Sequence, residues 1–414
     1  MERAVTLHLL AYVGLLLLLS YVGGKFANKF NFPRVTGYLV AGILLGPSVS
    51  GFFPATVVRE DLAIVTQLAL AVIAFSVGGS LNLGQLKNLG RQILWTTFTE
   101  ASGAFLLTTA VLAGVLPLLR GVAFSSPEFT SHYLPLALII GGLCAATAPA
   151  AVLAIVHEYR ARGPLTSVLL GVVALDDALA IIFTSLTLEF VGNHAHLADL
   201  SWWDSLVAPL RDIASALLLG LALALAIHWL FRFVTRRESL LSVALGTALL
   251  TGGLAVTFEI PFLLACMALG FGVANFVHRQ DELFSAVEGI EEPLFGIFFL
   301  LAGAHLDFSA IQIAGLVSLL ITVGRFSGKL LGARCGLYLA AAPAPVRKYL
   351  GLALLPQAGV AIGLVLEARS VLGPSEWSEI MVSGVLGAVI INELIAPPLV
   401  RYSLVKAGEA KGQE

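Results

Sequence analysis

The chain has 414 residues, of which 58% are hydrophobic and only 12% are charged, and its formal net charge is −2. This small net charge gives no indication of a nucleic acid or a strongly acidic molecule as partner. Apolar stretches of about 20 residues recur from end to end, and a helix of that length spans the hydrocarbon core of a bilayer. The sequence therefore predicts an all-α polytopic membrane protein. A β-barrel would show alternating segments of about ten residues, which this sequence lacks.

The first residues and the cysteines do not change this assignment. The N-terminus resembles a signal peptide, but its apolar core is too long and no small-x-small cleavage site follows, so we interpret it as the first span. Cys144, Cys266 and Cys335 all lie inside apolar runs. They are interpreted as core residues, not as a disulfide framework or a metal site, and no cofactor is expected.

The apolar runs divide the chain into thirteen candidate spans joined by short connections. A single membrane domain over residues 1–414 is therefore expected, with span 7 as a linker, a short tail at 402–414 and no cytosolic nucleotide-binding domain. The candidate spans are 4–22, 34–50, 60–81, 92–118, 134–156, 164–191, 207–231, 239–257, 260–277, 284–304, 309–338, 347–371 and 378–400.

Basic residues alternate between the two sets of connections. The connections after odd-numbered spans hold sixteen Lys and Arg residues, and the other set holds five. Because cytoplasmic loops carry the excess of Lys and Arg, this pattern predicts an outside N-terminus and a cytoplasmic C-terminus.

Two adjacent carboxylates interrupt the sixth span. Asp177 lies about 20 Å along it, and Thr147 lies about 20 Å along the fifth span, which runs the other way, so both are expected near the bilayer middle. A charge at that depth costs at least ~2.5–3.5 kcal/mol and therefore usually serves a function. Asp176 and Asp177 point about 100° apart on a helix, so they cannot share one partner.

Two spans contain helix-breaking residues at corresponding places. Pro149 in the fifth span and Pro356 with Gly359 in the twelfth fall near the span centres. If spans 1–6 and 8–13 are two halves, the broken spans are the fifth of each, and the halves begin on opposite sides. This arrangement predicts two inverted six-helix repeats with discontinuous helices crossing at the midplane.

The eleventh span carries Arg325 and Lys329 on one helical face. Lys329 is the candidate partner of one aspartate, which leaves the other free to bind either a proton or a small cation, since carboxylate and carbonyl oxygens suit such ions. Arg325 is a possible accessory residue. Glu100 and Glu393 are also possible accessory residues, although neighbouring hydroxyls could satisfy them.

These segments resemble the monovalent cation:proton antiporter superfamily, in the branch of bacterial Na⁺/H⁺ and Kef-type exchangers. The resemblance covers nearly the whole chain and is carried by PRVTGYLVAGILLGPSVSG (33–51), AFSVGGSL (74–81), TAPAAV (147–152), ALDDALAI (174–181), GRFSGKLLGA (324–333) and LALLPQAGVAIGL (352–364).

The resemblance implies roles for the residues above. Asp177 would bind Na⁺ and the proton, Asp176 would pair with Lys329, and Thr147 with the broken spans would complete the site. Spans 4–6 and 11–13 would form the moving core. Spans 1–3 and 8–10 would form the dimerisation domain of a homodimer in the bacterial inner membrane.

The Asp-Asp pair with a lysine favours electrogenic Na⁺/H⁺ exchange, because Kef-type potassium systems usually carry Gln-Asp. K⁺/H⁺ exchange is the closest alternative. An ion channel is the alternative from another class, although no filter-like sequence is present. An intramembrane aspartyl protease would need two facing aspartates from different helices, and the other aspartates all lie at span ends or in loops.

Overall fold

The computed structural model describes residues 8–81, 83–194, 202–230, 237–278, 280–306, 309–373 and 375–410, and these residues form α-helices and turns without a strand. Two short π-helical turns, Val57–Asp61 and Phe129–Tyr133, precede α3 and α5. The fifteen α-helices of the described residues are α1 (Leu9–Lys29), α2 (Arg34–Leu45), α3 (Ala63–Gly79), α4 (Leu83–Leu119), α5 (Leu134–Leu143), α6 (Pro149–Glu158), α7 (Pro164–His194), α8 (Trp202–Leu230), α9 (Arg237–Thr257), α10 (Phe262–Phe276), α11 (Gln280–His305), α12 (Ser309–Leu339), α13 (Ala344–Ala353), α14 (Gly359–Leu372) and α15 (Glu376–Lys406).

Each predicted span coincides with a helix or with a broken pair of helices. The fifth span corresponds to α5 and α6, the twelfth corresponds to α13 and α14, and every other span corresponds to one helix. Within the described residues, seven helices are long and apolar enough to cross a membrane, and shorter apolar helices accompany them. The predicted all-helical membrane fold is confirmed, while the count of thirteen crossings stays a prediction.

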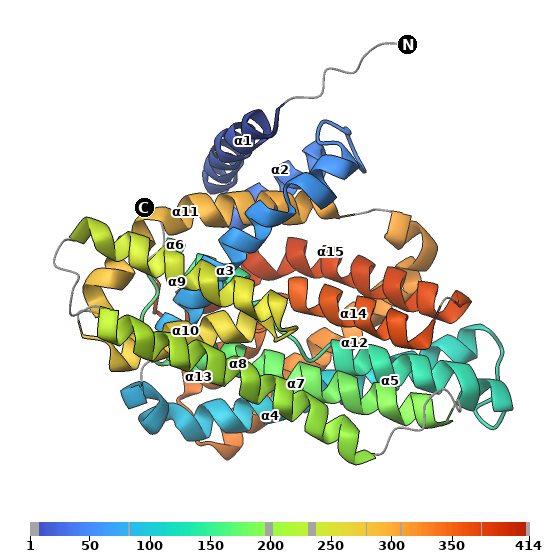
Figure 1. Ribbon diagram of the computed structural model, residues 1–414. Coiled ribbons are helices and arrows are strands. Elements are labelled where there is room, and N and C mark those ends of the chain that lie inside the picture. Colours follow the sequence, from blue (N-terminus) through green and yellow to red (C-terminus); the bar gives the residue numbers. More distant parts are fainter. Residues whose placement is uncertain are drawn as a thin grey trace, which may run out of the picture.

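The helices form one elongated bundle (Figure 1). α1, α2 and α11 pack together along one side, and α3 and α10 pack against each other and connect this side to the middle of the bundle. α12 packs along α4 on one flank and along α15 on another. The interrupted helices α5, α6, α13 and α14 therefore lie within a bundle that surrounds them with longer helices.

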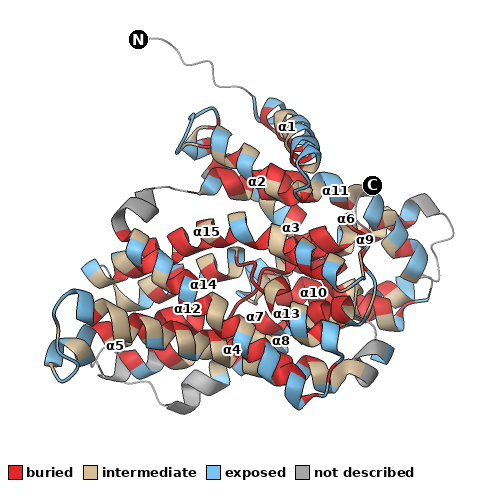
Figure 2. Cartoon of the chain, turned by 180° about the vertical axis from the view of Figure 1, so that it is seen from behind, coloured by how far each residue is buried: buried red, intermediate tan, exposed pale blue. Residues whose placement is uncertain are grey.

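The outer surface is apolar, as expected for contact with lipid. On α1, Leu10 is 76% exposed and Leu18 is 66% exposed, while the opposite side of this helix is buried (Figure 2). Apolar surface of this extent would be unusual on a soluble monomer. The expectation that Cys335 is a core residue is wrong, because this side chain is exposed on the outward face of α12.

Small residues allow α4 and α12 to approach closely. A β-carbon added to Gly103 would lie 2.5 Å from the carbonyl oxygen of Gly328, and one added to Gly328 would lie 2.3 Å from that of Gly103. The glycines of the Ser-Gly dipeptides at 102–103 and 327–328, which recur in the fourth and eleventh predicted spans, thus meet face to face. Such a seam of small residues is typical of helix packing in membranes.

The seam predicts that Gly328→Ala destabilises the protein by ~1–3 kcal/mol, because the new methyl group meets backbone atoms that cannot move aside. The matched control is Gly114→Ala on α4, where an added β-carbon meets nothing within 4 Å. The control should leave stability unchanged or raise it by up to ~1 kcal/mol. Thermal unfolding of the purified variants in detergent measures both, and equal melting temperatures would contradict the packing argument.

Candidate functional site

The two interrupted helices meet at their breaks. Residues 144–148 separate α5 from α6, residues 354–358 separate α13 from α14, and all ten residues are outside regular helix. The backbone N–H of Ala148 donates to the carbonyl oxygen of Pro356 at 2.9 Å, which joins one break to the other. The predicted pair of discontinuous crossing helices is therefore present in the fold.

The proline residues have different positions at the two breaks. Pro149 is the first residue of α6, where its missing N–H costs nothing and its fixed φ suits a helix start. Pro356 lies inside the unwound segment. Gly359 is the first residue of α14, has ordinary backbone angles and has open space around its Cα. The break therefore lies before Gly359.

The guanidinium group of Arg325 binds four backbone carbonyl groups at the breaks. It donates to Cys144 O at 3.1 Å and Ala146 O at 2.7 Å on one side, and to Leu355 O at 2.5 Å and Pro356 O at 3.3 Å on the other. These carbonyls follow the C-terminal ends of α5 and α13, where the helix dipole is negative, so a buried cation is stabilised there.

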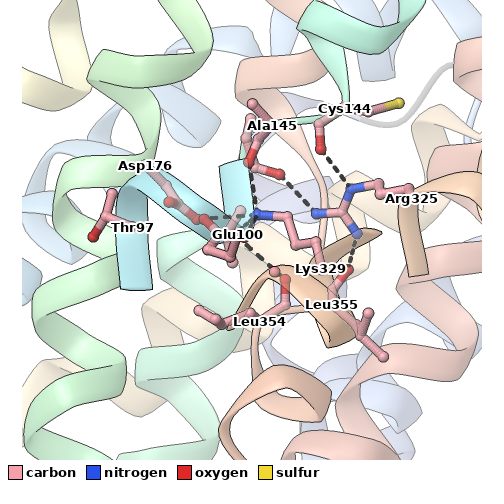
Figure 3. Close-up of polar contacts among 12 residues, drawn as sticks. Thr97, Glu100, Cys144, Ala145, Asp176, Arg325, Lys329, Leu354 and Leu355 are labelled. Carbon is pink, nitrogen blue, oxygen red and sulfur yellow. Dashed lines mark hydrogen bonds and ion pairs between the residues drawn. The ribbon is translucent and has the colours of Figure 1, made fainter. Parts of the chain in front are cut away.

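The amine of Lys329 lies one turn further along α12, beside Asp176 (Figure 3). It donates to Ala145 O at 2.6 Å, to Thr147 Oγ1 at 2.7 Å and to Asp176 Oδ2 at 3.1 Å. The Thr147 hydroxyl in turn donates to Asp176. The predicted grouping of Lys329, Asp176 and Thr147 is thus brought together from α12, α7 and the first break.

Glu100 on α4 is a second carboxylate partner of Lys329, with Oε2 2.7 Å from Nζ. The expectation that neighbouring hydroxyls satisfy Glu100 is wrong, because Thr97 and Thr99 donate to backbone carbonyls instead. The sequence signal for this contact was the pair of Ser-Gly dipeptides, which mark where α4 and α12 meet. One begins two residues after Glu100, and the other ends directly before Lys329.

Asp177 has a different environment from Asp176. It is 3% exposed, and neither of its carboxylate oxygens has a hydrogen-bond partner among the described residues. The 100° turn between neighbouring helical residues directs Asp177 away from Lys329. A buried carboxylate without a protein partner can be neutralised only by a proton or a cation.

Glu393 on α15 is also buried without a hydrogen-bond partner in the described part of the chain. Its neighbour Asn392 donates to Gln357 Oε1 at 2.8 Å, and Gln357 donates to Leu143 O at 3.3 Å. The two amides therefore add a further bridge between the breaks and α15. Glu393 takes no part in this bridge.

A cavity of about 910 Å³ opens at the end of α6. Charged side chains from α2, α6 and α11 face it, and they pair as Arg34 with Glu292 and His157 with Glu291. Its deepest lining residue on α7 is Leu170, seven residues before Asp177, which corresponds to about 10 Å along the helix.

Glu158 lines this cavity just beyond the predicted fifth span, 134–156. It accepts hydrogen bonds from the Arg34 backbone N–H, the closer at 2.9 Å, and so caps the start of α2. Burial raises the pKa of Glu158 to about 7, and the contacts with Arg34 offset only part of that increase.

Comparison with known proteins agrees with the geometry. The family model described as "Sodium/hydrogen exchanger, transmembrane" matches residues 14–402. The chain is 25% identical over 297 residues to the ammonium/H⁺ antiporter subunit AmhT of Alkalihalophilus pseudofirmus, with 72% of this chain and 70% of that protein covered. It is 23% identical to the Na⁺/H⁺-K⁺ antiporter GerN of Bacillus cereus, with 94% and 95% covered.

The fold also matches a solved structure. The sodium proton antiporter MjNhaP1 of Methanocaldococcus jannaschii superposes over the whole of both chains with a TM-score of 0.73 at 18% sequence identity. A second structure of MjNhaP1, at pH 8, covers 96% of this chain and 98% of that chain with a TM-score of 0.66 at 19% identity. At this level of identity the likeness concerns the fold alone.

The contacts of Arg325 predict that Arg325→Gln lowers the free energy of unfolding by about 3 kcal/mol or more, because buried carbonyls lose their donors at ~1–3 kcal/mol each. Arg334→Gln is the matched control, since Arg334 is an exposed residue of the same helix. Denaturant or thermal unfolding in detergent measures the difference, and a similar small effect of both substitutions would contradict the assignment.

The pKa of Glu158 predicts a pH dependence of stability. A carboxyl group whose folded pKa is raised from 4.5 to about 7 stabilises the folded state when protonated. That contribution is complete below about pH 4.5 and is lost as the pH rises through about 7. Between about pH 5 and about pH 8 the melting temperature of Glu158→Gln should therefore fall less than that of the wild type. Parallel plots of melting temperature against pH for the two proteins would refute the raised pKa of Glu158.

Proposed function

Because the chain belongs to the sodium/hydrogen exchanger family, we propose that it exchanges Na⁺ for protons by alternating access at the Asp176–Asp177 site. The observation that carries this proposal is Asp177, a buried carboxylate that has no hydrogen-bond partner among the described residues. It lies on α7 beside Asp176, which contacts the first break through Thr147. Such an oxygen site suits Na⁺ or a proton but not both, since each neutralises the same charge.

The division of roles between the aspartates follows from their contacts. Asp176 is held by Lys329 and Thr147, and its charge is balanced by Lys329 while it stays in place. Asp177 exchanges its proton for the cation. Opening the site first to one side of the membrane and then to the other converts this competition into exchange. Na⁺ and H⁺ are the cargo, and the proposal includes no cofactor.

The cavity at the end of α6 supports an access route from one side. Acidic and basic groups line it, and it approaches Asp177 along α7. The predicted topology assigns this side to the cytoplasm, since Arg160 and Arg162 at its rim belong to a connection rich in basic residues. We place the protein in the bacterial inner membrane with its N-terminus outside.

The proposed domains follow the spans. Spans 4–6 and 11–13, which carry the breaks and the site residues, are the moving core. Spans 1–3 and 8–10 are the dimerisation domain of a homodimer, and span 7 links the halves as inverted repeats. The exposed apolar face of α1 is consistent with a partner or lipid on that side.

Transport assays with Asp177→Asn test the site directly. The substitution keeps the side-chain volume but removes the charge that a proton and Na⁺ compete to neutralise, so exchange in proteoliposomes should vanish while folding survives. Glu128→Gln is the control, because Glu128 is an exposed carboxylate of a connection. Exchange by Asp177→Asn at a rate close to that of the control would refute the proposed site.

The identity of the cation is tested with Na⁺, Li⁺, K⁺ and NH₄⁺ in turn under an imposed pH gradient. We expect Na⁺ and Li⁺ to be exchanged well and K⁺ poorly, because the Asp-Asp pair resembles the sodium branch. The names of GerN and AmhT make K⁺ and ammonium the alternatives to include. A KM for K⁺ as low as that for Na⁺ would favour K⁺/H⁺ exchange.

We also expect exchange to be electrogenic, with more protons than Na⁺ ions moved per cycle, so an imposed membrane potential should change its rate. A potential set with valinomycin and K⁺ gradients, at constant pH gradient, measures this. An unchanged rate would indicate one proton per cation.

A further inference from the structure

Lys329 lies between two carboxylates that come from different helices. Its Nζ is 2.7 Å from Oε2 of Glu100 on α4 and 3.1 Å from Oδ2 of Asp176 on α7, and all three side chains are fully buried. A single ammonium group thus has two counterions, although one is enough to neutralise it. The second requires an explanation.

The two contacts differ in kind. The three ammonium hydrogens of Lys329 are used by Ala145 O, Thr147 Oγ1 and Asp176 Oδ2. Glu100 lies at ion-pair distance but accepts no hydrogen bond from the described residues. Its attraction for Lys329 is therefore electrostatic, and it acts beside the carboxylate of Asp176, which carries a like charge.

Within the described residues, no charged group other than Glu100 and Asp176 forms an ion pair with Lys329. Arg325 is the nearest other cation of α12, and its guanidinium group is bound to four backbone carbonyls. Glu100 and Asp176 are the two carboxylates that form ion pairs with Lys329 within the described residues. Asp177 faces away, and Glu393 lies on α15.

The glycine seam explains how Glu100 comes so close. A β-carbon on Gly332 would lie 2.7 Å from the Cα of Glu100, so any larger residue there would push α4 away from α12. Gly328 and Gly332 flank Lys329 on the side of α12 that packs against α4. The short contact between Glu100 and Lys329 is therefore built into the helix packing.

From this geometry we propose that Glu100 is a positioning residue of the transport site, which holds Lys329 as its permanent counterion so that Asp176 can leave Lys329 and join Asp177 at the bound cation. The inference rests on the proposed function and deepens it. Without Glu100, the departure of Asp176 would leave a buried ammonium without a counterion, which is costly in a low-dielectric interior. This cost would weaken the binding of the cation, because Asp176 could not leave Lys329 without it.

The test is a double-mutant cycle on the KM for Na⁺. Wild type, Glu100→Gln, Lys329→Gln and the double variant are reconstituted, and exchange is measured over a series of Na⁺ concentrations at fixed pH gradient. Glu100→Gln should raise the KM tenfold or more while the maximal rate changes less than threefold. In the Lys329→Gln background the same substitution should not raise the KM, because it acts only through Lys329.

Two further variants separate positioning from structural support. Glu100→Asp keeps the charge at a longer distance and should raise the KM by a smaller factor than Glu100→Gln. Where Glu100→Gln fails to fold, Glu100→Asp should still raise the KM above that of the wild type. Glu128→Gln, the exposed control, should match the wild type. A lowered melting temperature with an unchanged KM would assign Glu100 a structural role only and overturn the proposal. Multiplicative effects of Glu100→Gln and Lys329→Gln would overturn it as well.

Failure of the proposed function gives a different result. If the wild type exchanges a different cation, the same cycle is run with that cation and the proposal on Glu100 stands or falls on its KM values. If no cation drives exchange by the wild type, the proposed function is refuted, and the proposal on Glu100, which depends on it, is refuted with it.

Discussion

The structure depends on the satisfaction of backbone carbonyl groups at two interrupted helices. An unwound segment inside a membrane protein exposes polar backbone where water cannot reach it, and each unsatisfied group costs several kcal/mol. Arg325 and Lys329, one turn apart on α12, donate to carbonyls on both breaks. Arg325 therefore holds α5 and α6 against α13 and α14, and Lys329 adds contacts to the first break.

The same two cations set the charge of the site. Because Arg325 is fully engaged with carbonyls, it stabilises the breaks and leaves Lys329 to the carboxylates. Lys329 and Thr147 hold Asp176 in a network of hydrogen bonds, whereas Asp177 has no partner among the described residues. Two adjacent residues with the same chemistry thus acquire different properties from their helical positions alone. In this structure Asp176 is bound to Lys329 and Thr147, whereas Asp177 is available to a transported ion.

Close packing of α4 and α12 connects the framework to the site. Gly103, Gly328 and Gly332 let the two backbones approach until Glu100 reaches Lys329. Movement of α4 relative to α12 would separate these charges inside the protein, so the two helices are expected to move together. At the other end of α6, ion pairs with α2 and α11 line the cavity of about 910 Å³, where the contacts are partly exposed and cost less to rearrange.

The sequence by itself determined the helical membrane fold and the places of both breaks, and it singled out Asp176, Asp177, Thr147 and Lys329 as candidate site residues. It did so because hydrophobic length, helix-breaking residues and buried charge are local properties that leave a signal at fixed spacing. The tertiary structure decided how these groups pair. Glu100 with Lys329, Arg325 with four carbonyls, and Glu158 with the start of α2 each join segments from different parts of the chain. Their distances depend on how closely helices pack, and helix packing is set by the side chains of both partners, which no single segment of sequence contains.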